Sequence, residues 1–154
     1  MLISEIYHPH PKTILGSTTI ESAVNELLTD EVNALIVVDE QKKILGVLSS
    51  QDIAAHTIPR QFRKNIRMAA AMYKHGFFTE MCQELKSMPV TKVMRKEFTT
   101  VDLHDNIMAV TADFLKNDLY IVPVIEKGKL LGVVTRTEIK KALQYGMRDL
   151  TTKK

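Results

Sequence analysis

The sequence is poor in the residue types that mark several special classes of protein. Its 154 residues include one cysteine, Cys82, and no tryptophan, which excludes an intramolecular disulfide and a cysteine-rich zinc site. It has no run of about 18 apolar residues of the kind that crosses a membrane, and its first residues do not resemble a signal peptide. We therefore expect a cytoplasmic protein that does not bind membranes. The net charge of +3 is too small to predict nucleic acid as a partner.

Residues with catalytic or metal-binding potential are also few. Cys82 lies near no histidine in a catalytic sequence context, so we expect a small packing residue rather than a nucleophile. His8 and His10 flank a proline without a third ligand nearby, and we predict no metal site. Without a set of nucleophile, base and metal ligands, the sequence does not indicate an enzyme.

What the sequence does contain is an internal duplication. Its composition, 45% hydrophobic and 25% charged, is that of a globular protein. A pattern of glycine, two apolar residues, a hydroxyl residue, two variable residues and an acid occurs at residues 46–52 and again at residues 132–138. Copies of about 50 residues bury too little surface to be stable alone, so we expect the two copies to share a core.

The first copy predicts the order β-α-β-β-α. A strand near Thr13 precedes a helix that begins with a capping box at Thr18. The apolar positions of this helix are Ile20, Ala23, Val24, Leu27 and Leu28. Apolar runs at residues 34–38 and 44–48, joined by a polar turn, predict a strand hairpin. Ser49 is then expected to cap the closing helix.

The second copy repeats this order. Its opening strand is expected near Val101, and Asp102 is the predicted N-cap of the helix that follows. The buried positions of that helix are Ile107, Val110, Thr111, Phe114 and Leu115. Residues 120–125 and 130–134 predict a second hairpin, and residues 136–145 predict the closing helix.

The segment between the copies predicts two further helices. The first has helical spacing at Phe62, Ile66, Ala69 or Ala70, and Tyr73, and the second at Met81, Cys82 and Leu85, with Gly76 between them. The first helix is basic, with Arg60, Arg63, Lys64, Arg67 and Lys74 mostly on one side. This basic side could be solvated, contact the phosphate of a bound nucleotide, or bind nucleic acid or an anionic membrane surface.

The duplicated order resembles a tandem pair of CBS domains, also called a Bateman module. Val93-Met94 followed by Thr99-Thr100-Val101 resembles the opening of that domain, and Ile6-Tyr7 with Thr13-Ile14 is the counterpart in the first copy. The resemblance implies an α+β fold in which two β-α-β-β-α repeats pack through their sheets with pseudo-twofold symmetry, with the helical segment inserted between them.

The resemblance also implies a division of the chain and a function. The repeats would occupy residues 1–57 and 89–148, the helical segment residues 58–88 and a disordered tail residues 149–154. CBS pairs are non-enzymatic regulatory units that bind adenosine compounds, such as AMP, ADP, ATP or S-adenosylmethionine, in clefts between the repeats. The expected ligand is therefore an adenosine compound.

The motif of the first copy has chemistry that suits such a ligand. Ser49 and Asp52 stand at a predicted strand-to-helix junction, where helix N–H groups suit phosphate and a carboxylate suits ribose hydroxyls. Gly46 permits a backbone or a base to approach closely. By resemblance, Asp52 would bind the ribose and Ser49 would lie near ribose or phosphate. The same two residues also make an ordinary capping box that needs no ligand, and both interpretations stay open.

The second copy departs from the first. Thr135 takes the hydroxyl position, Arg136 adds a cation for phosphate oxygens, and Glu138 is one methylene longer than the aspartate usual in the family. We therefore expect the second site to be weakened, altered or empty. In the first copy, Val37 stands where the family often has proline. The candidate nucleotide-binding residues are Thr13, Ile14, Val37, Ser49 and Asp52 in one copy and Thr100, Val101, Tyr120, Pro123, Thr135, Arg136 and Glu138 in the other.

Two hypotheses about function follow. The first is a sensor of an adenosine compound that signals by a change of conformation or oligomeric state, acting as a homodimer or through an unidentified protein partner. The methionines in or beside the inserted segment, which include Met68, Met72, Met81 and Met88, suit ordinary packing or an adaptable interface. The alternative is a CBS-fold dimerisation or interaction scaffold with empty sites.

Overall fold

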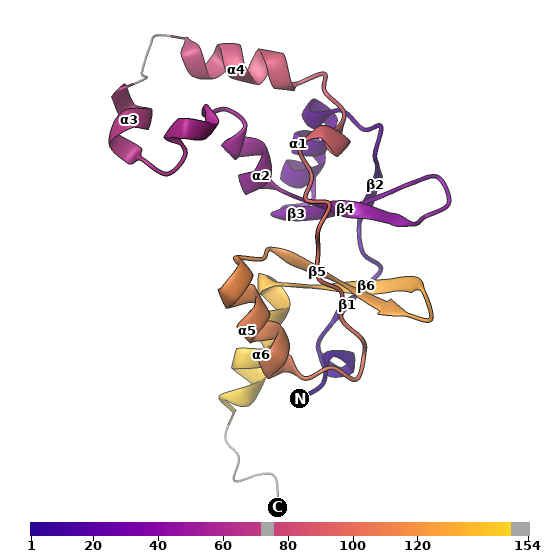
Figure 1. Ribbon diagram of the computed structural model, residues 1–154. Helices are drawn as coiled ribbons and strands as arrows, with labels where there is room; N and C mark the ends of the chain where they lie inside the picture. Colours follow the sequence, from indigo (N-terminus) through magenta and orange to yellow (C-terminus); the bar gives the residue numbers. More distant parts are fainter. Residues whose placement is uncertain (72–75, 149–154) are drawn as a thin grey trace, which may run out of the picture. The chain divides into compact units, whose positions relative to one another are not determined.

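The computed structural model describes residues 1–71 and 76–148 (Figure 1). These residues form two compact units, one of Lys12–Glu97 and the other of Met1–Pro11 with Phe98–Lys154. Met72, Tyr73 and Lys74 of the inserted segment, and the expected disordered tail, lie outside the described residues. None of the helices in the described ranges is long and apolar enough to cross a membrane.

A sheet of three strands forms the centre of the unit Lys12–Glu97. The middle strand, β3 (Ala34–Val38), pairs in parallel with β2 (Thr13–Leu15) and antiparallel with β4 (Ile44–Ser49). Every residue of β3 is buried, which explains why the strand has continuous apolar sequence instead of alternation. The predicted hairpin is confirmed.

The helix after β2, α1 (Ile20–Thr29), begins one residue later than predicted. Its N-cap is Thr19, whose hydroxyl accepts a hydrogen bond from the Ser22 N–H. Thr18 is still part of the preceding turn, where its N–H donates to the Leu15 carbonyl. The expected burial of Leu28 is also wrong, since this side chain is 72% exposed.

The inserted segment contains both predicted helices within its described part. The 3₁₀ turn η2 (Arg60–Phe62) leads into α3 (Ile66–Ala71), and α4 (Phe77–Leu85) follows. Gly76, in the left-handed conformation at φ 84°, is the N-cap of α4. Leu85 at the end of α4 joins the core of this unit, whereas Ile66 is 88% exposed. Helical spacing at Ile66 therefore indicates the helix but not a buried face.

The second unit is also built on three strands. Strand β6 (Lys129–Thr135) lies between β5 (Ile121–Glu126) and β1 (His8–Pro9), and both pairings are antiparallel. Strand β1 was not among the strands expected from the sequence. The expected opening strand of the second copy is reduced to one parallel bridge between Val101 and Val124.

The helices of this unit are α5 (Ile107–Asn117) and α6 (Arg136–Gly146). The predicted N-cap Asp102 is wrong, because Asn106 caps α5 and Asp102 instead accepts a hydrogen bond from the His104 N–H in the preceding turn. Leu115 of α5 was expected to be buried but is 80% exposed. A second core forms beneath these helices from Ile3, Val101, Val110, Phe114, Val122, Val124 and Val134.

Each unit contains an entry segment from the start of the other sequence copy. The 3₁₀ turn η3 (Val90–Lys92) and the residues after it pass beside β4, and η1 (Ile3–Glu5) leads into β1 beside β6. Arg95 pairs with Val47. The opening segment of each copy is thus built into the unit that carries the other copy's motif.

The two motif glycines lie where these segments approach. A Cβ atom on Gly46 would overlap the Arg95 carbonyl oxygen, and one on Gly132 would overlap the His8 carbonyl oxygen. Each glycine is required by close approach of a second backbone, and neither has a positive φ. The duplicated glycine therefore has a structural cause that needs no ligand.

We predict that Gly46→Ala destabilises the protein by about 1–3 kcal/mol, because the added methyl group meets backbone that cannot easily move. Chemical unfolding in urea would measure this change. Gly146→Ala is the matched control, since nothing lies within 4 Å of its Cβ position and alanine is a better helix residue. Equal stability of Gly46→Ala and the wild type would contradict the close approach.

Candidate functional site

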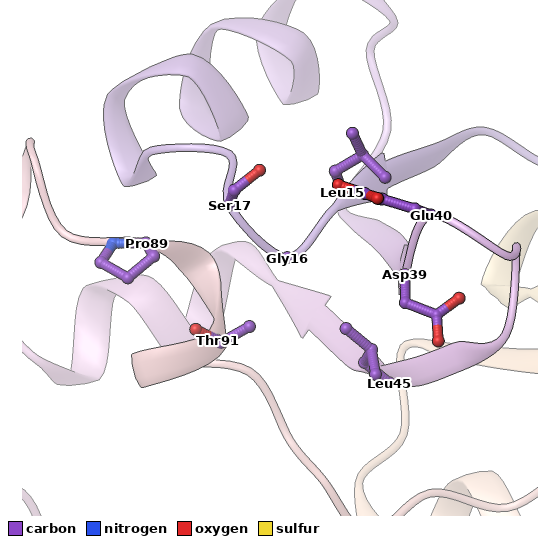
Figure 2. Close-up of a pocket in the computed structure, with 8 residues that line it drawn as sticks. All are labelled: Leu15, Gly16, Ser17, Asp39, Glu40, Leu45, Pro89 and Thr91. Carbon is purple, nitrogen blue, oxygen red and sulfur yellow. The ribbon is translucent and has the colours of Figure 1, made fainter.

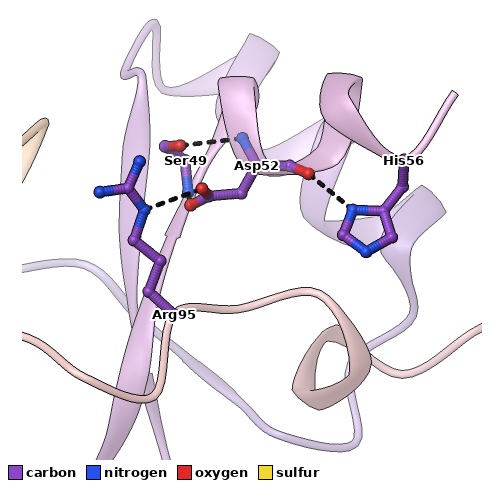
Figure 3. Close-up of polar contacts among 4 residues, drawn as sticks. All are labelled: Ser49, Asp52, His56 and Arg95. Atoms are coloured by element: carbon purple, nitrogen blue, oxygen red, sulfur yellow. Dashed lines mark hydrogen bonds and ion pairs between the residues drawn. The ribbon is translucent and has the colours of Figure 1, made fainter. Parts of the chain in front are cut away.

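The motif of the first copy forms a reciprocal capping box at the junction of β4 and α2 (Ser50–Ala55). The Ser49 hydroxyl accepts a hydrogen bond from the Asp52 N–H at 3.0 Å, and the Asp52 carboxylate accepts one from the Ser49 N–H at 2.9 Å (Figure 3). The nearby His56 Nδ1 lies 3.0 Å from the Asp52 carbonyl oxygen and not at the carboxylate. The capping interpretation of Ser49 and Asp52 is correct, and it leaves part of the carboxylate available.

The other oxygen of the Asp52 carboxylate binds a residue that the sequence analysis missed. Arg95 Nε lies 2.9 Å from Asp52 Oδ1, and the side chains are 36% and 11% exposed, respectively. Backbone hydrogen bonds in both directions between Arg95 and Val47 hold the arginine beside the motif. Asp52 and Arg95 are 43 residues apart, so no local pattern links them. One sequence feature could have pointed to Arg95. It follows Val93-Met94 in the second copy as His8 follows Ile6-Tyr7 in the first.

Glu138, the acid of the second motif, has different hydrogen-bond partners from Asp52. Both the Thr135 N–H and the Thr135 hydroxyl donate to Glu138 Oε1, at 2.8 and 2.7 Å. The Glu138 residue is 3% exposed. Its extra methylene lets the carboxylate fold back onto the threonine instead of reaching outward. Thr135 and Glu138 therefore form a self-contained cap at the start of α6.

Arg136 and Tyr120 of the second copy are brought together on the surface. The Arg136 guanidinium lies 4.2 Å from the centre of the Tyr120 ring, a cation–π contact. Arg136 also pairs with Asp118 at 3.3 Å, where the side chains are 50% and 78% exposed. Asp118 was not predicted to take part. Such an exposed ion pair adds little stability, so Arg136 can exchange this partner for a phosphate at small cost.

The other predicted residues are either buried in the core or exposed on the surface. Ile14 and Val37 are partners in the β2–β3 register, and both side chains are buried in the core. Pro123 is buried, and its carbonyl accepts a hydrogen bond from the Val101 N–H at 3.0 Å. Thr13 and Thr100 are exposed.

The pocket found in the unit Lys12–Glu97 is not at the motif. It has a volume of about 380 Å³ and includes Leu15, Asp39 and Thr91 in its lining (Figure 2). Asp39 follows the last residue of β3, whereas the register partner of Ser49 is the first residue of that strand. At about 3.3 Å per residue, the two ends are ~13 Å apart. Asp39 Oδ1 accepts hydrogen bonds from the N–H groups of Gln41 and Lys43, so this oxygen serves the turn between β3 and β4.

No metal-binding constellation is present in residues 1–71 and 76–148, where no group of three or more His, Cys, Asp or Glu side chains is placed to hold an ion. His8 belongs to β1, and His10 follows it with a positive φ of 59°. The free Cys82 is partly buried in α4.

The model of the CBS domain family matches the chain at residues 3–57 and again at residues 90–145. The chain belongs to the CBS domain family. Its two matches and its structural neighbours confirm the expected tandem pair of CBS repeats with a mixed α+β fold. Both motifs lie within the matched residues.

Curated relatives resemble the chain in sequence at low identity. The transcriptional repressor CcpN of Bacillus subtilis is 25% identical over 139 residues, covering 86% of this chain and 55% of the repressor. MJ1404 of Methanocaldococcus jannaschii, a protein described as uncharacterized, is 26% identical over 84% of this chain and 28% of its own length. The chain thus spans about half of one relative and about a quarter of the other.

Two solved structures contain adenosine compounds. CBSX2 in complex with AMP has a TM-score of 0.70 and 19% identity, covering 96% of this chain and 98% of that chain. The CBS domain pair of MJ0100, in complex with 5′-methylthioadenosine and S-adenosyl-L-methionine, has a TM-score of 0.69 and 22% identity, covering 93% and 99%. At these identities, the likeness establishes the fold alone.

We predict that Asp52 and Arg95 are energetically coupled. In a double-mutant cycle with Asp52→Asn and Arg95→Gln, we expect a coupling free energy of about 0.5–1 kcal/mol, reduced by the partial exposure of the arginine. Urea unfolding of the four proteins would measure it.

The ion pair of Lys12 and Asp30 is the control, because these side chains are 47% and 30% exposed. The hydrogen bond to Asp30 raises the pKa of Lys12. We nevertheless expect the smaller coupling there, since solvent screens this pair more. A coupling for Lys12 and Asp30 as large as that for Asp52 and Arg95 would contradict the prediction.

Proposed function

We propose that this CBS pair is a regulatory module that binds an adenosine compound through the motif of its first copy. The observation that carries the proposal is the Asp52 carboxylate, which is 11% exposed and held by a donor on each oxygen. The candidate ligands are AMP, ADP, ATP and S-adenosylmethionine. Binding of AMP by CBSX2, and of 5′-methylthioadenosine and S-adenosyl-L-methionine by the MJ0100 pair, supports this ligand class.

The geometry of Asp52 suits a pair of ribose hydroxyls. Each carboxylate oxygen has two acceptor positions, and the Ser49 N–H and Arg95 Nε use one on each oxygen. One position on each oxygen remains for a hydroxyl donor. Because the carboxylate is already fixed by these two bonds, little side-chain entropy is lost when a ligand binds. Thr13 and the backbone near Ile14 and Val37 would complete the site.

The second copy fits the alternative hypothesis, in which a CBS repeat holds no ligand. Glu138 is buried and accepts two hydrogen bonds from Thr135. Both bonds are to Oε1, so it is the burial of this carboxylate that would hinder a ribose. We propose that the second copy serves mainly in assembly, with Tyr120, Thr135 and Arg136 as its remaining contacts for a ligand.

The proposed output is a change in conformation or self-association. Several large apolar side chains are exposed on the neighbouring helices α5 and α6, namely Met108, Leu115 and Leu143, and Met147 at the C-cap of α6 is exposed as well. Exposed apolar surface of this kind favours burial against a second copy of the chain or a protein partner. A ligand can shift such an equilibrium only by its preference for one of the two states.

We expect AMP, ADP, ATP or S-adenosylmethionine to raise the melting temperature of the protein. A ligand at 100 times its dissociation constant adds roughly 2.7 kcal/mol to the free energy of unfolding. Thermal-shift measurements with these compounds and with GMP as a base control would detect it. The absence of a shift with all four adenosine compounds at millimolar concentration would refute the proposal.

Variants of the two motif carboxylates test which copy binds the ligand. Asp52→Asn should weaken ligand binding at least ~10-fold, since hydrogen bonds to a charged group contribute about 1.5–3 kcal/mol. Glu138→Gln should have a smaller effect. Asp105→Asn is a matched control in the other unit, because Asp105 accepts a local hydrogen bond from the Asp102 N–H. A loss of binding with Glu138→Gln but not with Asp52→Asn would place the ligand in the second copy.

A further inference from the structure

Arg95 holds Asp52 through one edge of its guanidinium and leaves the rest unused. Its Nε donates to Asp52 Oδ1, and no hydrogen bond or ion pair joins its two terminal nitrogens to another of the described residues. An arginine has five N–H donors, so four remain. In Figure 3 these nitrogens point away from the Asp52 carboxylate. The side chain is 36% exposed, so a solute can reach them.

The charge of Arg95 also changes what the motif can bind. An isolated, poorly exposed Asp52 carboxylate would repel the phosphate of a nucleotide, because like charges a few ångströms apart repel strongly at low dielectric. Pairing with Arg95 removes that net charge. The remaining N–H groups form a planar fork that matches two phosphate oxygens.

The position of the arginine is set by backbone and does not depend on a flexible loop. Arg95 exchanges two backbone hydrogen bonds with Val47, and the preceding Val93 is buried in the core. The guanidinium is therefore presented beside the carboxylate before a ligand arrives. Acceptors for sugar hydroxyls and donors for an anion lie next to one another, as the hydroxyls and phosphate do on a ribose 5′-phosphate.

We propose that Arg95 binds the 5′-phosphate of a nucleotide whose ribose lies on Asp52, so that the first-copy site selects phosphorylated adenosine compounds over 5′-methylthioadenosine and S-adenosylmethionine. This inference rests on the proposed function and narrows it to AMP, ADP or ATP. The opposite possibility is that Arg95 blocks the Asp52 carboxylate, so that their ion pair must break before a ligand binds. In that case, removal of the arginine would tighten binding.

The test is isothermal titration of the full chain with AMP, adenosine and 5′-methylthioadenosine. We expect the wild type to bind AMP at least ~10-fold more tightly than the two uncharged compounds. Arg95→Gln should reduce this ratio to below about three, mainly by weakening AMP. Lys96→Gln removes the same charge from the adjacent exposed residue and should keep the wild-type ratio.

A second variant tests whether the charge of Arg95 or the geometry of its guanidinium matters. Arg95→Lys keeps the charge but loses the fork and the Nε donor, so an intermediate AMP preference is expected. Circular dichroism and urea unfolding would confirm that the variants fold. Equal weakening of all three compounds by Arg95→Gln, or tighter AMP binding, would overturn the role of Arg95 and leave the proposed function standing. Failure of the wild type to bind any of the three would overturn the AMP preference proposed for Arg95, whereas the proposed function would fall only if ADP, ATP and S-adenosylmethionine also failed to bind.

Discussion

The close approach of a second backbone to each motif glycine is the constraint on which both candidate sites depend. Gly46 and Gly132 admit the carbonyls of Arg95 and His8 where any side chain would overlap them. The sheet of each unit is thereby flanked by an entry segment from the other part of the sequence. Because the side chain at the point of approach lies beside the motif, its identity decides the electrostatic surroundings of that motif.

This exchange of segments makes two similar motifs chemically unequal. In the first copy, the approaching residue is Arg95, and its guanidinium pairs with the motif aspartate. In the second copy, the equivalent residue is His8, and the motif acid Glu138 bonds to its own Thr135. The Asp52 carboxylate is thus held by a cation with unused donors, whereas the Glu138 carboxylate is buried and bonds through one oxygen to Thr135. The difference between the two motifs therefore has two sources, the change from aspartate to glutamate and the residue of the entry segment.

Local features of the fold were predictable because they depend on local chemistry. The buried run 34–38 and the cap at Ser49 follow from apolar sequence and hydroxyl capping alone. Helical periodicity identified Phe114 on the buried face of α5 but placed Leu115 there as well, since spacing indicates a face without fixing its width. The ion pair of Asp52 with Arg95 could not be predicted, because tertiary packing unites residues 43 positions apart. Whether the predicted site residues bind a nucleotide stays a prediction.

The same entry segment offers a physical route from ligand to response. Arg95 lies at the end of a segment that begins with η3, where the Val90 N–H donates to the Thr18 carbonyl and the Val90 side chain is fully buried. Leu85 of α4 belongs to the same core. A phosphate bound to Arg95 would therefore contact a segment that is continuous in the chain with the inserted helices. Its effect would not be confined to one side chain. Since a ligand shifts an equilibrium only through differential affinity, the response would require Arg95 to hold phosphate better in one arrangement of this segment than in another.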